Sequence, residues 1–307
     1  MSTTPTAAGT LPVAEQTDLH REEPSRKKRL FGGGALVKIV LALVCLLWSV
    51  PTIGLLVTSF RSGDDATANG WWTVLWAPFR TEWTLGNYEE VIVEGGMGAA
   101  FVNSLVVAIP ATIIPILVAA MAAYGFTFLR FPGRTFLFVV VVALLVVPIQ
   151  VAFIPLLQFY GDVGLTGTFL AVWLAHTGFG MPLAIYILRN YMATLPLSII
   201  ESAKVDGASH FTTFWRLVLP MSTPALAAFA IFQFLWVWND LLIALIFLGV
   251  GENAVVTSRL ANLIGQYGQR WHLLTAGAFV SMVVPLIVFL VLQRFFVRGL
   301  TAGSVKG

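Results

Sequence analysis

The sequence predicts an all-α integral membrane protein with six transmembrane helices. Hydrophobic residues make up 58% of the 307 positions and charged residues only 11%, whereas soluble domains carry roughly a quarter charged residues. The mean hydropathy is +0.85. A membrane helix needs about 20 mostly apolar residues. Six runs meet or approach that length, and they lie at 36–58, 99–123, 135–157, 168–190, 221–248 and 274–297.

The first 30 residues differ in composition from the rest. They are rich in Thr, Ala, Pro and Glu and end in a basic cluster, Arg26 to Arg29. This pattern predicts a disordered cytoplasmic tail with a basic anchor next to the membrane. The run 36–58 is too long for the core of a signal peptide and no clean cleavage site follows it, so it is predicted to be a retained first span. Residues 31–307 then form one six-span domain.

Proline occurs inside most of these runs. It is tolerated in membrane helices where neighbouring groups satisfy the freed backbone carbonyl. The prolines either bend the helices around a pathway or are ordinary packing kinks, since proline is common in such helices. They are Pro51, Pro110, Pro115, Pro148, Pro155, Pro182 and Pro285.

The distribution of Lys and Arg predicts the orientation of the chain. Cytoplasmic loops carry an excess of these residues. One set of span ends carries Arg21, Arg26, Lys27, Lys28, Arg29, Lys38, Arg130, Arg134, Arg189, Lys204, Arg216, Arg294, Arg298 and Lys306, and the other only Arg61, Arg80, Arg259 and Arg270. Both termini and the connection 195–220 are therefore expected to be cytoplasmic.

The first connection on the opposite side, 60–98, is long and aromatic. It contains Trp71, Trp72, Trp76 and Trp83 among several glutamates. Such residues are typical of an aromatic belt at the membrane interface. They would equally suit a docking surface for an external partner. The second long outer connection, 249–273, is polar.

Residues Leu195–Pro220, which we call the hook, predict two short helices separated by a turn. Pro196 suits the first turn of a helix, where a missing N–H is harmless. Asp206-Gly207 predicts a helix end, because Gly adopts the left-handed conformation freely. Ser209 can cap the second helix, and Pro220 is expected to break or kink the chain as it enters the next span. On these residues alone, an amphipathic connecting loop is favoured over a docking element.

Several chemistries are missing from the sequence. No G-x-x-x-x-G-K-[ST] motif is present to hold nucleotide phosphates, and no G-x-S-x-G elbow occurs. The single cysteine, Cys45, permits no intrachain disulfide, and the four dispersed histidines lack metal-ligand spacing. The net charge of +3 reflects residues flanking spans, so nucleic-acid binding is not indicated. We expect no catalytic residue, no metal site and no cofactor bound by this chain.

The densest polar cluster within a predicted span is 232–240 (FQFLWVWND). Polar side chains inside a membrane are candidates for function. Aromatic rings can stack on the C–H faces of a sugar while amide and carboxylate groups bind its hydroxyls. Hydrogen bonding between helices is an equally good explanation. The candidates for a substrate pathway are Gln233, Trp236, Asn239 and Asp240.

The hook resembles the Glu-Ala-Ala loop of bacterial ATP-binding-cassette importer permeases. In that pattern Glu-Ala-Ala is followed at fixed spacing by Asp-Gly-Ala and then Leu-Pro. The matching residues are Glu201, Ser202, Ala203, Asp206, Gly207, Ala208 and Ser209, with Phe214, Leu219 and Pro220 downstream. Ser202 departs from the usual Ala, and we expect little consequence because Ser is also small. The segments 175–182 (AHTGFGMP), 231–240 (IFQFLWVWND) and 294–307 (RFFVRGLTAGSVKG) are similar to permeases of maltose/α-glucoside importers.

This resemblance implies a type I importer permease fold and a multi-subunit transporter in the bacterial inner membrane. Its other parts would be a second, non-identical permease, two ATP-binding subunits that hold ATP and Mg, and an extracytoplasmic sugar-binding (lipo)protein. The hook would couple the permease to an ATPase. The C-terminal residues Gly303, Ser304, Val305, Lys306 and Gly307 would also reach it. The substrate would be an α-glucoside such as maltose, a longer malto-oligosaccharide, trehalose or sucrose, which the partner permease could hold instead.

Two other classes of protein compete with this interpretation. A stand-alone secondary transporter or channel would need ionisable groups within the membrane for ion coupling, and only Asp240 is plausibly placed. A membrane enzyme would need converging acid–base or nucleophilic residues within the spans, and none are visible.

Overall fold

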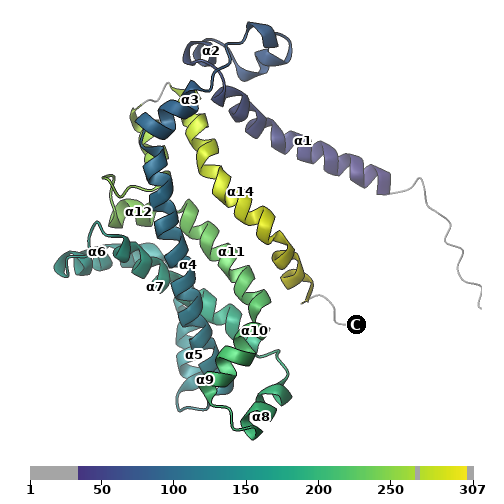
Figure 1. Ribbon diagram of the computed structural model, residues 1–307, viewed down its shortest axis with the longest axis vertical. Helices are drawn as coiled ribbons and strands as arrows, with labels where there is room; N and C mark the ends of the chain where they lie inside the picture. Colours follow the sequence, from purple (N-terminus) through teal and green to yellow (C-terminus); the bar gives the residue numbers. More distant parts are fainter. Residues whose placement is uncertain (1–33, 267–269, 303–307) are drawn as a thin grey trace, which may run out of the picture. The chain divides into compact units, whose positions relative to one another are not determined.

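The computed structural model describes residues 34–266 and 270–302 (Figure 1). Regular structure in these ranges is helical, apart from one isolated β-bridge between Arg61 and Trp83. The chain divides into two compact units, 1–50 and 51–307. The described part of the first unit is the beginning of helix α1 (Gly34–Ser59). The predicted N-terminal tail lies outside the described residues.

Four of the described helices are long and apolar enough to cross a bilayer, and the total reaches six if each of two bent pairs is one span. The four helices are α1, α4 (Met97–Phe128), α7 (Phe169–Met192) and α14 (Trp271–Ala302). One bent pair joins 134–146 to 149–162 at 96°, and the other joins 210–221 to 223–239 at 73°. The pairs comprise α5 (Arg134–Ala143), η4 (Leu144–Val146), η5 (Ile149–Ala152) and α6 (Phe153–Asp162), then α9 (His210–Thr213), η6 (Phe214–Val218), α10 (Leu219–Met221) and α11 (Thr223–Asn239).

The third and fifth predicted spans are therefore not single straight helices. In the third, Val147 is extended because a residue before proline is driven out of the helical region, and Pro148 is the extended N-cap residue that precedes η5. In the fifth, α11 ends at Asn239, and the short helix α12 (Leu242–Phe247) follows an extended Asp240. The apolar run 221–248 therefore contains two helices, α11 and α12.

Helix α4 is the central helix of the second unit, and it packs along α7 and α11 (Figure 1). Its contact face is lined by fully buried small residues, including Ala108, Ala111 and Ala119. Small side chains let membrane helices approach closely, which strengthens their van der Waals contact. With 32 residues the helix is about 48 Å long at roughly 1.5 Å per residue. The aromatic connection 60–98 adjoins its beginning, and the hook packs on its end.

A buried arginine organises the outer connection 60–98. The side chain of Arg61 is 1% exposed. Its Nε donates to Asp65 Oδ2 at 2.9 Å, and its terminal nitrogens donate to the carbonyl oxygens of Asp65 and Asn69. Asn87 in turn donates to the carbonyl oxygens of Ser59 and Arg61. The connection is therefore folded, with the short elements α2 (Gly63–Ala68), η1 (Trp71–Leu75), η2 (Pro78–Arg80), α3 (Gly86–Glu89) and η3 (Glu90–Glu94).

The aromatic side chains of this connection divide into two groups. Trp71 covers Gly54, where an added Cβ would lie only 2.6 Å from the indole nitrogen. Trp72, Trp76 and Trp83 are more than half exposed. Exposure of the second group suits both the interfacial belt and the docking surface that the sequence allowed.

The Arg61–Asp65 pair gives the outer connection a predicted sensitivity to acid. The hydrogen bond from Arg61 holds the pKa of the Asp65 carboxyl below its ordinary value. The pair therefore contributes stability above the unfolded pKa, about 3.9, and that stability is lost as pH falls through the lower folded pKa. We expect Asp65→Asn to lower the melting temperature at neutral pH. We also expect it to flatten the decline between about pH 5 and pH 3, measured by tryptophan fluorescence in detergent.

The matched control is Asp64→Asn, because Asp64 is exposed and makes no ion pair among the described residues. It should keep the wild-type pH dependence. An identical response of the two variants would show that the ion pair does not stabilise this connection.

Candidate functional site

The first half of the hook is helix α8 (Leu197–Val205). Pro196 lies immediately before it as the N-cap residue, one position earlier than the first turn. The side chain of Ile200 is buried against the end of α4, whereas Leu197 and Val205 are exposed. The helix therefore has one anchored face and one free face.

The turn at Gly207 is a Schellman motif. Ala208 N–H donates to Ala203 O, and Gly207 N–H donates to Lys204 O. Gly207 has a φ of +77°, in the left-handed region that L-residues with a Cβ rarely adopt. Ser209 then caps α9, its Oγ accepting from Thr212 N–H at 3.2 Å. The helix end and the cap that the sequence predicted are both confirmed.

The second half of the hook is fixed to α4 by aromatic contacts. Phe214 is 5% exposed, and its ring centroid lies 5.4 Å from that of Tyr124 in an edge-to-face arrangement. The hydroxyl of Tyr124 lies 3.0 Å from His210 Nδ1. Edge-to-face aromatic pairs add roughly 0.5–1.5 kcal/mol beyond the area they bury. These contacts join the second half of the hook to the end of α4.

The helix continues through Pro220 instead of breaking there. Residues 214–218 form a π-helical turn, and Leu219 N–H donates to Phe214 O. A π-turn widens the backbone, which relieves the clash that a proline ring makes with the carbonyl four residues earlier. The bend of 73° follows at Ser222. Leu219 is half-buried and Pro220 is exposed at this end of the hook.

The motif residues of the hook fall into an exposed set and an anchored set. Ala203 and Phe214 are buried, and Ala208 is half-buried. Their small or aromatic side chains fill the contact with the helices. The exposed set comprises Glu201, Ser202, Asp206, Gly207 and Ser209. Residues Gly303 to Gly307, the predicted C-terminal contact, lie outside the described residues.

The four pathway candidates do not share one environment. Gln233 is fully buried, and its Nε2 donates to Ala111 O of α4 at 3.1 Å. It also packs against Gly180 of α7, where an added Cβ would lie 2.8 Å from Gln233 Oε1. Trp236 is half-buried, with its ring centroid 5.3 Å from that of His176. Asn239 is exposed and donates to Leu235 O.

Asp240 closes the end of α11 and begins α12. Its Oδ1 accepts from Ile243 N–H at 2.7 Å, and its carbonyl oxygen accepts from Thr257 Oγ1. A small cavity of about 10 Å³, lined in part by Ser104, His176 and Asp240, lies beside it. Such a volume holds at most one water molecule. A sugar would therefore require a more open arrangement of these helices.

Sequence reasoning missed a helix in the outer connection 249–273. Helix α13 (Val256–Gln266) begins there, and Val256 N–H donates to Ser104 Oγ of α4 at 2.9 Å. Asn103 donates to Glu252 O and Ala254 O from the same end of α4. Ser104 and Asn103 were visible as polar residues at the start of a span. Their partners, more than a hundred residues away, were not.

This helical membrane domain has a hook anchored on one side and a polar cluster within its spans. These features place it in the permease class of membrane transport proteins. The chain belongs to the family described as the binding-protein-dependent transport system inner membrane component, whose model matches residues 115–302. That range contains the hook, α7, α11 and the whole of α14.

Two curated relatives cover nearly the whole chain. The osmoprotective compounds uptake permease protein GgtD of Synechocystis is 53% identical over 289 residues, covering 94% of this chain and 97% of the relative. The α-glucoside transport system permease protein AglG of Rhizobium meliloti is 43% identical over 380 residues, covering 92% and 99%. Both are named as permeases. Together with the family match they show that this chain is a multi-pass permease subunit of a transport system and not an enzyme.

A solved bacterial ABC transporter for the import of the acidic polysaccharide alginate shares the fold. The TM-score is 0.68 with 19% sequence identity, covering 89% of this chain and 98% of that one. A second structure of an alginate ABC transporter, in complex with a pentasaccharide-bound periplasmic protein, gives a TM-score of 0.60 with 15% identity. The importer permease fold expected from the hook is thereby confirmed.

The turn of the hook yields a prediction about backbone conformation. Nothing lies within 4 Å of a Cβ placed on Gly207, so a substitution there changes φ preference without a clash. Gly207→Val should weaken the turn by about 1–2 kcal/mol. Hydrogen exchange of the peptide 197–213, which contains the bonded Ala208 amide, should become faster.

The control is Gly207→Asn, because Asn adopts the left-handed conformation more readily than other residues with a Cβ. Its exchange should stay close to wild type. Equal acceleration in both variants would mean that loss of φ freedom is not what matters at Gly207.

Proposed function

We propose that this chain moves an α-glucoside of the maltose type, a di- or oligosaccharide, across the bacterial plasma membrane. It does so by alternating access, driven by ATP hydrolysis on a partner subunit. The observation that carries the substrate class is the 43% identity to an α-glucoside permease over 92% of the chain. Maltose and trehalose are the first sugars to test.

The proposed assembly contains this chain and a second, non-identical permease. Two ATP-binding subunits hold ATP and Mg, and an extracytoplasmic sugar-binding lipoprotein delivers the sugar. The hook and both termini face the cytoplasm, in line with the excess of Lys and Arg on that side. We also propose that the last residues, Gly303 to Gly307, contact the ATPase. The surrounding lipid is the inner membrane, and nucleic acid has no part in the function.

The division of the hook into two faces supports a coupling role. Glu201, Asp206 and Ser209 are free to contact an ATPase, while Ile200 and Phe214 are buried against the membrane helices. A rigid element anchored on one side transmits a displacement instead of absorbing it. The two nucleotide-dependent positions of the ATPase would thus bias two arrangements of the spans.

The exposed acid of the hook gives a direct test of coupling. Glu201→Arg reverses a charge on the free face of α8 and should lower retention of the ATPase subunit during purification about tenfold or more. Membrane insertion should not change, because Glu201 is exposed. Co-purification of the ATPase subunit with the tagged chain is the measurement.

The same Glu→Arg change at Glu94 is the control. Glu94 is also exposed, but it belongs to the connection at the other end of α4. The Glu94 variant should retain the ATPase fully. Normal retention and normal sugar uptake by the Glu201 variant would contradict the coupling role.

For the substrate, we propose that Trp236, Asn239 and Asp240 line the pathway when the spans open. Trp236 offers an aromatic face, and Asn239 and Asp240 offer hydrogen-bonding groups at the break between α11 and α12. Gln233 lies behind them and, in the described arrangement, ties α11 to α4. Its part in the pathway depends on the helices moving apart.

A second candidate substrate class comes from the 53% identity to an osmoprotective compounds uptake permease. An uncharged polyhydroxylated osmoprotectant would present hydroxyls and C–H faces similar to those of a disaccharide. The same pathway residues could serve it. The two candidates differ in substrate size and ring content, which uptake measurements can separate.

The deciding experiment is uptake by the complete transporter in proteoliposomes. Labelled maltose should enter with ATP inside, and unlabelled α-glucosides should compete better than osmoprotectants that are not α-glucosides. Asn239→Ala should raise the apparent KM about two- to tenfold through one lost hydrogen bond, with assembly unchanged. Gln233→Ala should instead reduce yield and thermal stability.

Competition only by osmoprotectants that are not α-glucosides would overturn the substrate assignment. Unchanged kinetics of the Asn239 variant would return that residue to a packing role. Sugar flux without ATP, through liposomes that contain this chain alone, would favour a stand-alone transporter.

A further inference from the structure

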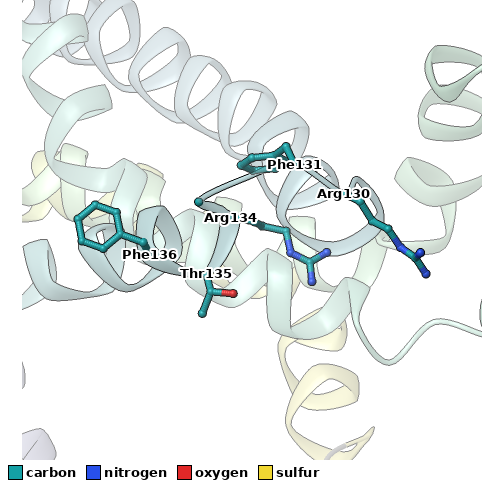
Figure 2. A pocket seen from close by; sticks show the side chains of 6 residues that line it. Arg130, Phe131, Arg134, Thr135 and Phe136 are labelled. Carbon is teal, nitrogen blue, oxygen red and sulfur yellow. The ribbon is translucent and has the colours of Figure 1, made fainter.

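We propose that the loop between α4 and α5, residues 129–133, forms a binding site for the phosphate headgroup of an anionic phospholipid. The inference does not depend on the identity of the transported sugar. It rests on two arginines that border a cavity at the membrane boundary. Figure 2 shows the side chains of Arg130 and Arg134 extending to the same side of the view, with Phe136 on the other side of the loop.

Two hollows meet at these arginines. The smaller has a volume of about 370 Å³ and is lined by residues 130, 131 and 133–136. The larger hollow, about 700 Å³, lies between this loop and the hook, and Lys204 also lines it. Arg130 and Arg134 line both hollows, and Glu201 is the only acidic residue lining either. The combined lining therefore carries a positive charge that favours an anion.

The guanidinium groups remain available for a ligand. One terminal nitrogen of Arg134 donates to Leu129 O at 3.0 Å, and this bond fixes the position of the guanidinium group. The other N–H groups of Arg134 do not take part in that bond. Within the described residues no hydrogen bond or ion pair is recorded for Arg130. The planar fork of an arginine matches the oxygens of a phosphate in a bidentate arrangement.

A further cation, outside the lining of the two hollows, adds to the positive field. The guanidinium carbon of Arg189 lies 4.9 Å from the centroid of the Phe138 ring. Phe138 is four residues beyond Arg134 on α5, and residues with that spacing lie on the same face of a helix. Arg189 thus places positive charge about one turn deeper along the helix that carries Arg134.

The apolar surroundings favour a lipid over free phosphate. The loop joins α4, a membrane span, to α5, the first half of a bent one, so it lies at the level where headgroups begin. Phe136 is 70% exposed, and Leu137, Val139 and Val140 beyond it are exposed as well. The acyl chains of a lipid would lie along this surface while its phosphate occupied the arginine hollow. A free phosphate would gain nothing from these side chains.

The test uses the complete transporter in detergent and measures binding of phosphatidylglycerol by native mass spectrometry. Phosphatidylcholine at the same concentration is the reference lipid. Arg130→Gln should raise the Kd for phosphatidylglycerol about fivefold, and Arg130→Gln with Arg134→Gln about 25-fold, if each cation contributes as an arginine near an anionic surface does. Binding of phosphatidylcholine should change little.

Two further variants separate the site from general charge and from misfolding. Arg130→Lys keeps the charge and should keep most of the affinity. Arg216→Gln removes an exposed arginine of the hook that lines neither hollow and should bind as the wild type does. Thermal melting of each variant checks that the fold is intact.

Three results would overturn the proposal. The first is unchanged phosphatidylglycerol affinity in the double variant, and the second is an equal loss in the Arg216 variant. The third is displacement of the lipid by inorganic phosphate at millimolar concentration, which would show that the hollow recognises free phosphate. Failure of sugar transport, in contrast, would bear only on the proposed substrate.

Discussion

The burial of Phe214 against Tyr124 is the contact on which the rest of this molecule's working arrangement depends. It joins the hook to the end of α4, and the contact between Tyr124 and His210 fixes the direction of that joint. Without this contact, the hook would be joined to α4 less firmly, and its exposed face would not be held in one position. The contact is aromatic and almost fully buried, so it holds the hook against α4. The charged face of the hook stays in water.

The hook could be predicted well from sequence because its signals are local. Asp206-Gly207 predicts a left-handed helix end, and Ser209 predicts a cap three residues before its N–H partner. Neither signal needs information from elsewhere in the chain. The break or kink expected at Pro220 lies two residues later, at Ser222, because the compensating π-turn is not a local preference. That turn forms where Phe214 and Val218 are held in the core.

The helix breaks within the spans, and the contacts of the polar side chains there, were less predictable because they depend on residues far away in the sequence. The end of α11 is stabilised by Thr257 through the carbonyl of Asp240, and no periodicity in 221–248 contains that contact. Spacing placed Gln233 and Trp236 near one face of a helix. It did not reveal that Gln233 would meet Ala111 of α4 while Trp236 met His176 of α7. Likewise, only the fold of 60–98 brings Arg61 among carbonyl oxygens.

Helix α4 connects these regions in a way that limits how the molecule can move. Near its start Asn103 and Ser104 bind the segment that begins α13, at its middle Ala111 accepts from Gln233, and near its end Tyr124 contacts the hook. A helix is stiff along its axis because its internal peptides are hydrogen-bonded, but Pro110 and Pro115 each remove one N–H donor from α4. A displacement at Tyr124 therefore reaches Ala111 and Ser104 as a tilt or translation of the helix, reduced by any bending at these two prolines. Opening beside Asp240 then requires either that α11 move with α4 or that the Gln233 bond break. The hydrogen bond between Gln233 and Ala111 is thus placed where it can be formed in one arrangement of the spans and broken in another.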